Sequence, residues 1–199
     1  MNAFHKTVVW TSLLFLAKGV EAQTAGDVPV VQITKEGSLV RFAVKASVSI
    51  EGTFDKWDAT LTYPSTDAEA GVLDIKIQAD SVSTGSGMKD DKLKSKDFFD
   101  AKDDPYITFH STKMTQTGPT TVEVQGNFTI RGVSKPETLI FAITGKGTGS
   151  GEIKGTMAFD RKDYGMNKGI PLVKIADRVE VIVDLKGKRV SGPPLVFKQ

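Results

Sequence analysis

Apolar side chains occupy every second position through most of the chain after residue 38. Between residues 73 and 79, leucine, isoleucine and alanine alternate with aspartate, lysine and glutamine, and a similar alternation runs from residue 122 to residue 131. Successive side chains of a β-strand point to opposite faces of the sheet, so this period of two predicts strands with one buried and one solvated face. An α-helix, with its period of 3.6 residues, does not fit the pattern.

About eight such segments follow one another, separated by turn-rich stretches such as Thr84–Gly87 and Thr148–Gly151. Short amphipathic strands separated by Gly-rich turns are typical of an all-β antiparallel sandwich or barrel. The segment 122–131 is long for a sandwich strand and suits a tilted barrel strand, which favours the barrel. Gly52 is expected at a turn or bulge, and a short helix is expected over residues 88–99.

The first 22 residues differ from the rest of the chain. Lys6 precedes an apolar run over residues 7–17, and Val20-Glu21-Ala22 has the form of a cleavage site. These features predict a secretory signal peptide over residues 1–22. We therefore expect a periplasmic protein with one domain over residues 23–187 and a C-terminal tail over residues 188–199.

The charge balance argues against two classes of partner. Removal of residues 1–22 takes away two of 26 basic and one of 24 acidic residues, which changes the formal net charge from +2 to +1. A chain with so little excess charge is not expected to bind nucleic acid. No later segment is long and apolar enough to span a bilayer, so we expect no stable membrane insertion.

The sequence also lacks the usual signals of an enzyme. It has no cysteine, and His110 is the single histidine after residue 22. Its place in the alternation opposes Ile107 and Phe109, so we expect it to face solvent. No Gly-x-Ser-x-Gly sequence is present. Because neither a nucleophile with its base nor a set of metal ligands is indicated, we expect no catalytic residue, no metal and no cofactor.

The apolar stripes leave two alternatives open for the interior. An eight-stranded barrel either fills with its own side chains or holds one ligand, and the pattern alone does not decide between them. Burial of ten methylene groups at about 0.8 kcal/mol each gives roughly 8 kcal/mol, or about micromolar affinity before the costs of binding. A lumen of this kind therefore binds a lipid without any catalytic group.

Two phenylalanines stand in an otherwise charged stretch, Lys94–Asp104. One interpretation is that Phe98 and Phe99 plug one end of an apolar lumen, with Leu93 beside them. The alternative is that one ring belongs to the core while its neighbour is half exposed. A plug of this kind would control the entry of a lipid.

Arg161, Asp163 and Tyr164 form the best polar cluster, at the end of an apolar strand. They are candidates for hydrogen bonds to a lipid head group, with Arg161 favouring an anionic group such as phosphate. The alternative is a surface ion pair between Arg161 and Asp163 that caps a turn.

Four motifs occur together and in order: LKSKDFFD from residue 93, PYITFHS from residue 105, GNFTIRGV from residue 126 and FDRKDYG from residue 159. In this combination the chain resembles the YceI-like family of secreted, lipocalin-like proteins, from about residue 38 to residue 186. The resemblance implies an extended eight-stranded antiparallel barrel with a short helical segment over one end. It also implies a lumen that accepts a long isoprenoid or other amphiphilic lipid, such as a polyprenyl chain or a quinone.

With this resemblance we expect binding, sequestration or transport of such a lipid. The alternatives are an enzyme that modifies a bound lipid and a filled barrel that acts through its surface. The sequence allows a homodimer without requiring one. The residues expected to line the lumen are Phe42, Val44, Phe54, Trp57, Leu73, Ile75, Ile77, Phe98, Phe99, Ile107, Phe109, Phe128, Ile130, Phe141, Met157, Phe159, Val181 and Val183.

Overall fold

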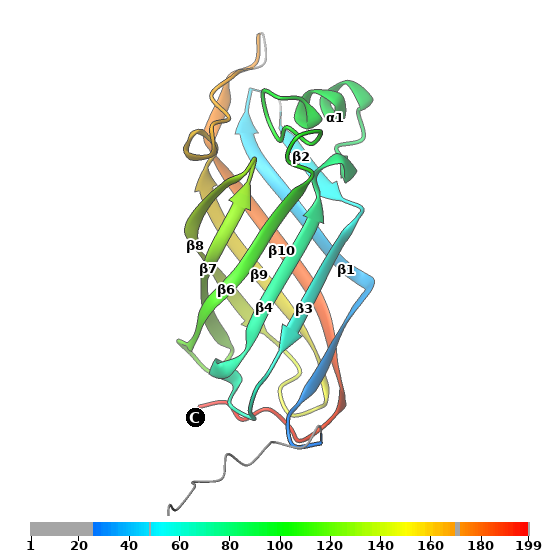
Figure 1. The fold of residues 1–199 in the computed structure, drawn as a ribbon, viewed down its shortest axis with the longest axis vertical. Helices are drawn as coiled ribbons and strands as arrows, with labels where there is room; N and C mark the ends of the chain where they lie inside the picture. Colours follow the sequence, from blue (N-terminus) through cyan, green and yellow to red (C-terminus); the bar gives the residue numbers. More distant parts are fainter. Residues whose placement is uncertain (1–25, 48, 170–171, 199) are drawn as a thin grey trace, which may run out of the picture.

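The computed structural model describes residues 26–47, 49–169 and 172–198, so the expected signal peptide lies outside the described residues. The described part is nearly all β-structure, with one α-helix and three short 3₁₀ segments (Figure 1). The elements are β1 (Val30–Ala46), β2 (Ile50–Phe54), β3 (Trp57–Thr62), η1 (Ala68–Ala70), β4 (Val72–Gln78), η2 (Ala79–Ser81), β5 (Val82–Ser83), α1 (Gly87–Lys94), β6 (Tyr106–Gln116), β7 (Thr121–Ile130), β8 (Val133–Ile143), β9 (Ser150–Asp160), η3 (Arg161–Tyr164) and β10 (Ile175–Ser191).

The strands form one antiparallel sheet that closes on itself. The order is β10-β9-β8-β7-β6-β4-β3-β1-β2-β5, and β10 also pairs with β1. β2 and β3 follow each other in the chain and both pair with β1, while β5 is a short addition to β2. Eight strands, β1, β3, β4 and β6 to β10, therefore make the closed wall. The predicted all-β, eight-stranded antiparallel barrel is confirmed.

The period of two in the sequence becomes an inside and an outside of this wall. On β1, Val40, Phe42 and Val44 are buried, whereas Arg41 and Lys45, at positions of the opposite parity, are exposed. Because the sheet closes, the inward-facing side chains of all strands share one interior, and the buried apolar residues form one core cluster. His110 is exposed as expected, and its Nδ1 lies 2.6 Å from Oδ1 of Asp74 on the outer surface.

Gly52 does not lie at a turn or bulge, and that prediction is wrong. It lies inside β2, opposite Phe42 of β1. A Cβ atom at Gly52 would come within 2.7 Å of the Phe42 ring. Gly155 has the same relation to Phe141, at 2.3 Å. These glycines leave room for a large ring on the neighbouring strand, which is a second reason for glycine inside a strand.

The helix is shorter than predicted. α1 ends at Lys94, and the chain then turns through residues 95–104 instead of continuing to residue 99. In these turns the Phe99 N–H donates to the Leu93 carbonyl and the Asp100 N–H donates to the Ser95 carbonyl. A continuous helix would place Leu93 and Phe99 about 120° apart around its axis. The turns bury both side chains against the same end of the barrel.

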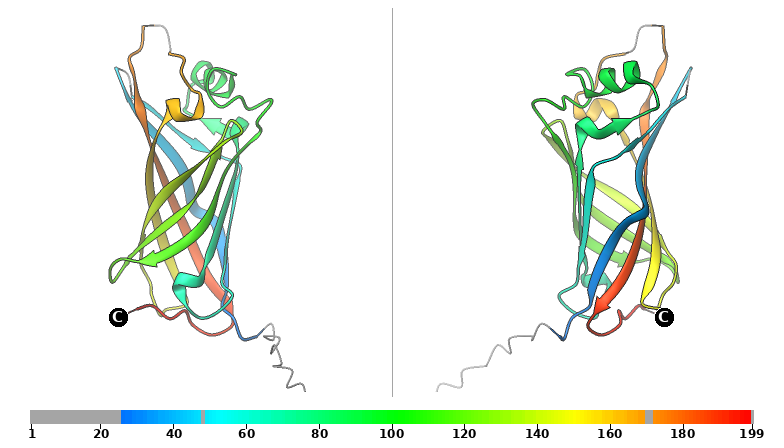
Figure 2. Two further views of the ribbon diagram at one scale, coloured as in Figure 1. Left: turned by 60° about the vertical axis from the view of Figure 1, so that its left-hand side comes forward. Right: turned by 90° about the vertical axis from the view of Figure 1, so that its right-hand side faces the viewer.

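The two ends of the barrel are built from different parts of the chain (Figures 1 and 2). The end drawn uppermost carries α1, the turns of residues 95–104 and η3, and we call it the upper end. The lower end carries η1 and the C-terminal residues 193–198, which cross beneath the strands. The expected tail from residue 188 begins inside β10, because that strand continues to Ser191.

Candidate ligand-binding interior

An apolar chamber lies inside the upper end of the barrel. Its volume is about 60 Å³, and Arg161 is the single charged residue in its lining. The lining contains eleven of the residues expected for the lumen: Phe42, Val44, Phe54, Ile77, Phe98, Phe99, Ile107, Phe128, Ile130, Phe159 and Val181. It also contains residues that the sequence analysis did not assign to the lumen: Val40, Ile50, Leu93, Met166, Ile175 and Val179.

The other predicted lumen residues are buried, but they do not line the upper chamber. They are Trp57, Leu73, Ile75, Phe109, Phe141, Met157 and Val183. Val183 is one of those that occupy the middle of the barrel. On β10, Val183 and its inward-facing neighbour Leu185 lie between Val181 of the upper chamber and Gly187 of a second, lower chamber. Val183 and Leu185 are only 2% and 1% exposed. We call the packed zone formed by Leu139, Phe141, Met157, Val183 and Leu185 the middle belt.

The chamber is small compared with a long lipid. Its 60 Å³ is less than half of the roughly 150 Å³ cavity that accepts benzene in an engineered protein, and drug-sized ligand sites measure about 300–1,000 Å³. The interior thus lies between the two alternatives left open by the sequence: it is mostly filled, with a dry apolar space under the upper cover. A long chain therefore requires side chains to move apart.

Phe98 and Phe99 both point into the upper end and are 4% and 7% exposed. The Phe99 ring contacts Phe42 edge-on at a centroid distance of 6.1 Å, and it lies 5.8 Å from Phe54. The alternative in which one of the two rings is half exposed is therefore wrong. Because the charged stretch folds as tight turns, both rings face the interior while the flanking charges remain at the surface.

Arg131 ties the two halves of the upper cover together. Its Nη1 donates to the Gly165 carbonyl at 2.5 Å, and its Nη2 donates to the Lys96 carbonyl at 3.0 Å. One arginine thereby connects the turn that carries the phenylalanines with the end of η3. Its Nε is buried without a hydrogen-bond partner in the described part of the chain. The sequence analysis did not single out Arg131, although the residue follows Ile130 directly in the motif GNFTIRGV.

Arg161 is buried and bonds to nearby backbone carbonyls and to Asp177. Its Nε donates to the Ala176 carbonyl at 3.2 Å, and its Nη1 donates to the carbonyls of Met166 and Lys168. Its Nη2 contacts Asp177 at 3.0 Å. These contacts use four of the five donors of a guanidinium group.

Asp163 and Tyr164 have partners of their own. Asp163 is exposed and pairs with Lys135 at 3.1 Å, so the alternative ion pair between Arg161 and Asp163 is wrong. The Tyr164 ring is fully buried against Phe128 and Phe159, and its hydroxyl donates to Glu137 at 2.9 Å. Burial and this bond to a carboxylate raise the pKa of Tyr164 far above its usual range. Of the three head-group candidates, Arg161 alone lines the chamber.

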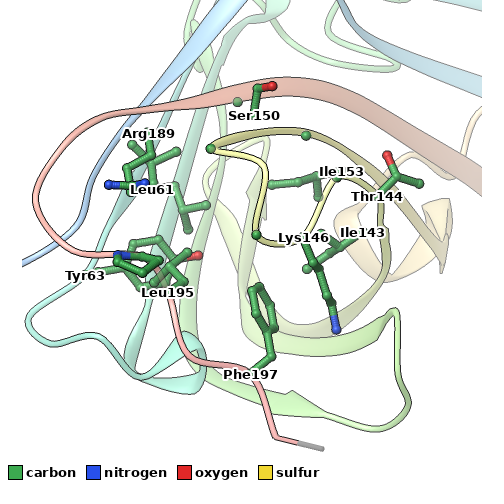
Figure 3. Close-up of a pocket in the computed structure, with 17 residues that line it drawn as sticks. Leu61, Tyr63, Ile143, Thr144, Lys146, Ser150, Ile153, Arg189, Leu195 and Phe197 are labelled. Carbon is green, nitrogen blue, oxygen red and sulfur yellow. The ribbon is translucent and has the colours of Figure 1, made fainter.

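The second chamber lies at the lower end and measures about 110 Å³ (Figure 3). Its wall is apolar, with Leu61, Ile143 and Ile153 from the strands and Leu195 and Phe197 from the C-terminal residues. Arg189 and Lys146 are the charged residues of its lining. No residue from this chamber was expected to bind a ligand, since its wall comes from strand ends and the tail.

Potential metal ligands do not gather in the described residues. Within residues 26–47, 49–169 and 172–198, no group of three or more histidine, aspartate or glutamate side chains is placed to hold a metal ion. The geometry that stands out is therefore that of the barrel interior, which suits contact with apolar groups.

A closed wall of eight antiparallel strands, an apolar interior and a cover at each end define a lipocalin-like barrel. Within that class the chain belongs to a known family: the model of the YceI-like domain matches residues 32–187. The resemblance inferred from the four sequence motifs is thereby confirmed.

Relatives and solved structures agree with this assignment. A UPF0312 protein of Pseudomonas savastanoi pv. phaseolicola is 29% identical over 177 residues, which cover 83% of this chain and 92% of that protein. The crystal structure of BcnA from Burkholderia cenocepacia is 26% identical, with a TM-score of 0.70 and coverage of 78% of this chain and 99% of that one. A polyisoprenoid binding domain from Saccharophagus degradans is 14% identical, with a TM-score of 0.65 and coverage of 81% and 99%, and shows the likeness of the fold alone.

Proposed function

We propose that this protein binds a long isoprenoid-type amphiphile, such as a polyprenyl chain or a quinone, inside the barrel. The observation that carries the proposal is the upper chamber, whose lining is apolar apart from Arg161 and whose cover holds two phenylalanines inside the wall. The fold is shared with a domain described as polyisoprenoid binding, which supports the choice of ligand class. The protein acts as a carrier or store and has no catalytic step.

In this proposal the lipid enters by displacing side chains. Phe99 leaves its contacts with Phe42 and Phe54, and the lipid chain widens the upper chamber down to the middle belt. Each buried methylene contributes about 0.8 kcal/mol, so about ten of them offset the cost of moving the plug and still leave a favourable binding energy. Arg161, the charged residue of the lining, contacts the polar end of the lipid in this proposal.

We also propose that the protein is exported to the periplasm through cleavage of residues 1–22. None of the helices in the described part of the chain has the length and hydropathy needed to cross a bilayer. An exported carrier in an aqueous compartment shields the hydrocarbon of its ligand from water. The association of two chains is compatible with this role.

The test is native mass spectrometry of the freshly purified protein, with lipid extraction from the same sample. We expect one isoprenoid-type lipid per chain, unchanged in structure after incubation. Repeated preparations without bound lipid, and without uptake of an added quinone, would contradict the proposal. Chemical change of the added lipid would instead indicate an enzyme.

A double variant Phe98→Ala, Phe99→Ala tests the role of the cover. We expect faster uptake and release of a polyprenyl quinone, because the aromatic plug is gone. Tyr106→Ala is the matched control, since this ring is 43% exposed on the outer surface. Equal rates in the double variant and the unaltered protein would remove the gating claim and leave binding itself untouched.

A filled barrel that acts through its surface is the second candidate, and the small volume of the upper chamber favours it. An apolar fluorescent probe, N-phenyl-1-naphthylamine, separates the two. A lipid-binding barrel takes up the probe and releases it when a quinone is added. A filled barrel leaves the fluorescence at the level seen in buffer.

A further inference from the structure

The C-terminal residues 193–198, which we call the C-terminal strap, are fastened to the lower end by many polar contacts. The Val196 N–H donates to the Thr66 carbonyl at 2.8 Å, and the Val196 carbonyl accepts from the Ala68 N–H at 3.0 Å. The side chain of Gln116 bonds to both the N–H and the carbonyl of Lys198, each at 2.8 Å. Lys198 also forms an ion pair with Glu69. The family model ends at residue 187, so the strap lies outside the matched part of the chain.

The strap presents its side chains in an alternating way. Val196 is 61% exposed, whereas Leu195 and Phe197 on either side are half-buried and line the lower chamber (Figure 3). Lys146 lies over the Phe197 ring, with its Nζ 4.2 Å from the ring centroid. The strap thus forms an apolar cover over a chamber of about 110 Å³, nearly twice the volume of the upper chamber.

The charged residues in the lining of the lower chamber are both cations. Among the described residues the lining includes Arg189 and Lys146 and no carboxylate. Both cations contact neutral groups: Arg189 donates to the Gly192 carbonyl, and Lys146 donates to the Pro119 carbonyl. Within residues 26–47, 49–169 and 172–198, Arg189 has no carboxylate partner. A half-buried guanidinium in this situation attracts an anion, and its remaining donors suit a carboxylate.

Tyr63 adds a polar group to the same apolar wall. In the described part of the chain the Tyr63 hydroxyl has no hydrogen-bond partner. Burial raises the pKa of Tyr63 to about 12, so the phenol is neutral at pH 7. A neutral phenol is a hydrogen-bond donor to an oxygen atom of a ligand. The lining therefore combines a short apolar space, the hydroxyls of Tyr63, Thr144 and Ser150, and two cations.

We propose that the lower chamber is a second ligand site, for a medium-chain carboxylic acid in its anionic form. The carboxylate lies at Arg189, and the alkyl chain occupies the space under Leu195 and Phe197 toward Lys146 on the opposite side of the chamber (Figure 3). Because about 110 Å³ is less than the roughly 150 Å³ of a cavity that accepts benzene, the strap moves outward to make room for the alkyl chain. The middle belt separates this site from the upper chamber, so the proposal holds whether or not the upper chamber binds an isoprenoid lipid.

The test is calorimetric titration of the full-length purified protein with decanoate and with decanol. The two ligands share an alkyl chain and differ in charge. We expect decanoate to bind one to one and at least about tenfold more tightly than decanol, since a hydrogen bond to a charged group is worth about that factor. Absence of decanoate binding, or equal affinity for the two ligands, would overturn the proposal.

The variant Arg189→Gln identifies the site. We expect it to weaken decanoate about tenfold or more and to leave decanol unchanged. Arg178→Gln is the matched control, because Arg178 lies on the same strand with 71% of its side chain exposed. A loss of both ligands together would mean that Arg189 only maintains the structure, and would count against the proposal. Tyr63→Phe is the milder second variant and is expected to weaken decanoate several-fold.

A blocked upper chamber distinguishes this proposal from the proposed function. Val181→Trp fills the upper chamber and is expected to abolish quinone uptake while decanoate still binds. Leu195→Trp fills the lower chamber and is expected to have the opposite effect. If Val181→Trp removed decanoate binding and Leu195→Trp did not, the carboxylate would occupy the upper chamber and the second site would be refuted.

Discussion

The upper and lower ends of the barrel both carry a cover, but the two covers differ in origin and in what holds them. The upper cover comes from the middle of the chain, buries two phenylalanines and is tied by Arg131. The lower cover is the C-terminal strap, whose apolar side chains are half-buried and whose contacts lie mainly at the surface. Exposed hydrogen bonds and little apolar burial are features of segments that open locally at low cost. The comparison therefore predicts a tight upper end and a lower end that opens first.

The largest difference in the free energy of unfolding is expected when one ring of each cover is truncated. Phe99→Ala removes a buried ring packed on Phe42 and Phe54, and we expect it to lower the free energy of unfolding by about 3 kcal/mol or more. Phe197→Ala removes a half-buried ring, and we expect a loss of about 1 kcal/mol. Chemical denaturation of both variants measures the difference. Equal losses would mean that the strap is as much a part of the core as the plug.

The next-largest effect on stability is expected for Arg131, whose hydrogen bonds connect the two parts of the upper cover. Arg131→Met leaves the carbonyls of Lys96 and Gly165 without their donor, so we expect a loss of about 2 kcal/mol in the free energy of unfolding. Hydrogen exchange of the Phe98 and Phe99 amides should also accelerate. Arg178→Met, on the exposed face of β10, is the control and should stay within about 0.5 kcal/mol of the unaltered protein. Unchanged exchange at the plug would show that apolar packing alone holds the upper cover.

High pH is expected to weaken both ends through their tyrosines. Burial raises the pKa of Tyr63 from 10.0 to about 12, and the pKa of Tyr164 is raised further. Both phenols then stay protonated in the folded state while they ionise in the unfolded chain above pH 10, so stability is constant below that pH and falls as the pH rises. Tyr63→Phe and Tyr164→Phe should each reduce the slope of stability against pH by up to about one proton. Denaturation from pH 9 to pH 11.5 measures it, and an unchanged slope in either variant would contradict the assignment.

The smallest effect is expected at the strap in acid. Lys198 and the Gln116 N–H hold the pKa of Glu69 below its ordinary value of 4.5. The stabilisation is therefore present above the ordinary glutamate range and is lost as the pH falls through the lowered pKa. We expect the amide resonances of Val196 and Lys198 to move toward free-chain positions before those of Phe98 and Phe99. Glu69→Gln should show the same shifts of the Val196 and Lys198 resonances already at pH 7. If the resonances of both covers moved together in acid, the lower end would not be the one that opens first.

The same contrast appears in what the sequence allowed us to predict. The alternation over residues 73–79 and 122–131 predicted strands with a buried face, and the structure buries Leu73, Ile75, Val122 and Val124. The amphipathic pattern is a local property of the chain, and closure of the barrel preserves it. The first half of β1 was missed, because its register against β10 shifts between Thr34 and Leu39 and the alternation is lost there.

The fold class, the inward-facing positions of the strands and the family follow from the sequence alone, because alternation with a period of two and short motifs are local properties of the chain. Tertiary structure decided how much space the interior has, because the volume depends on rings that meet from distant parts of the chain, such as Phe42 and Phe99. It also decided the partners of Arg131 and Arg161 and the position of the strap on Glu69 and Gln116. Those contacts join segments far apart in the chain, and no local pattern specifies them.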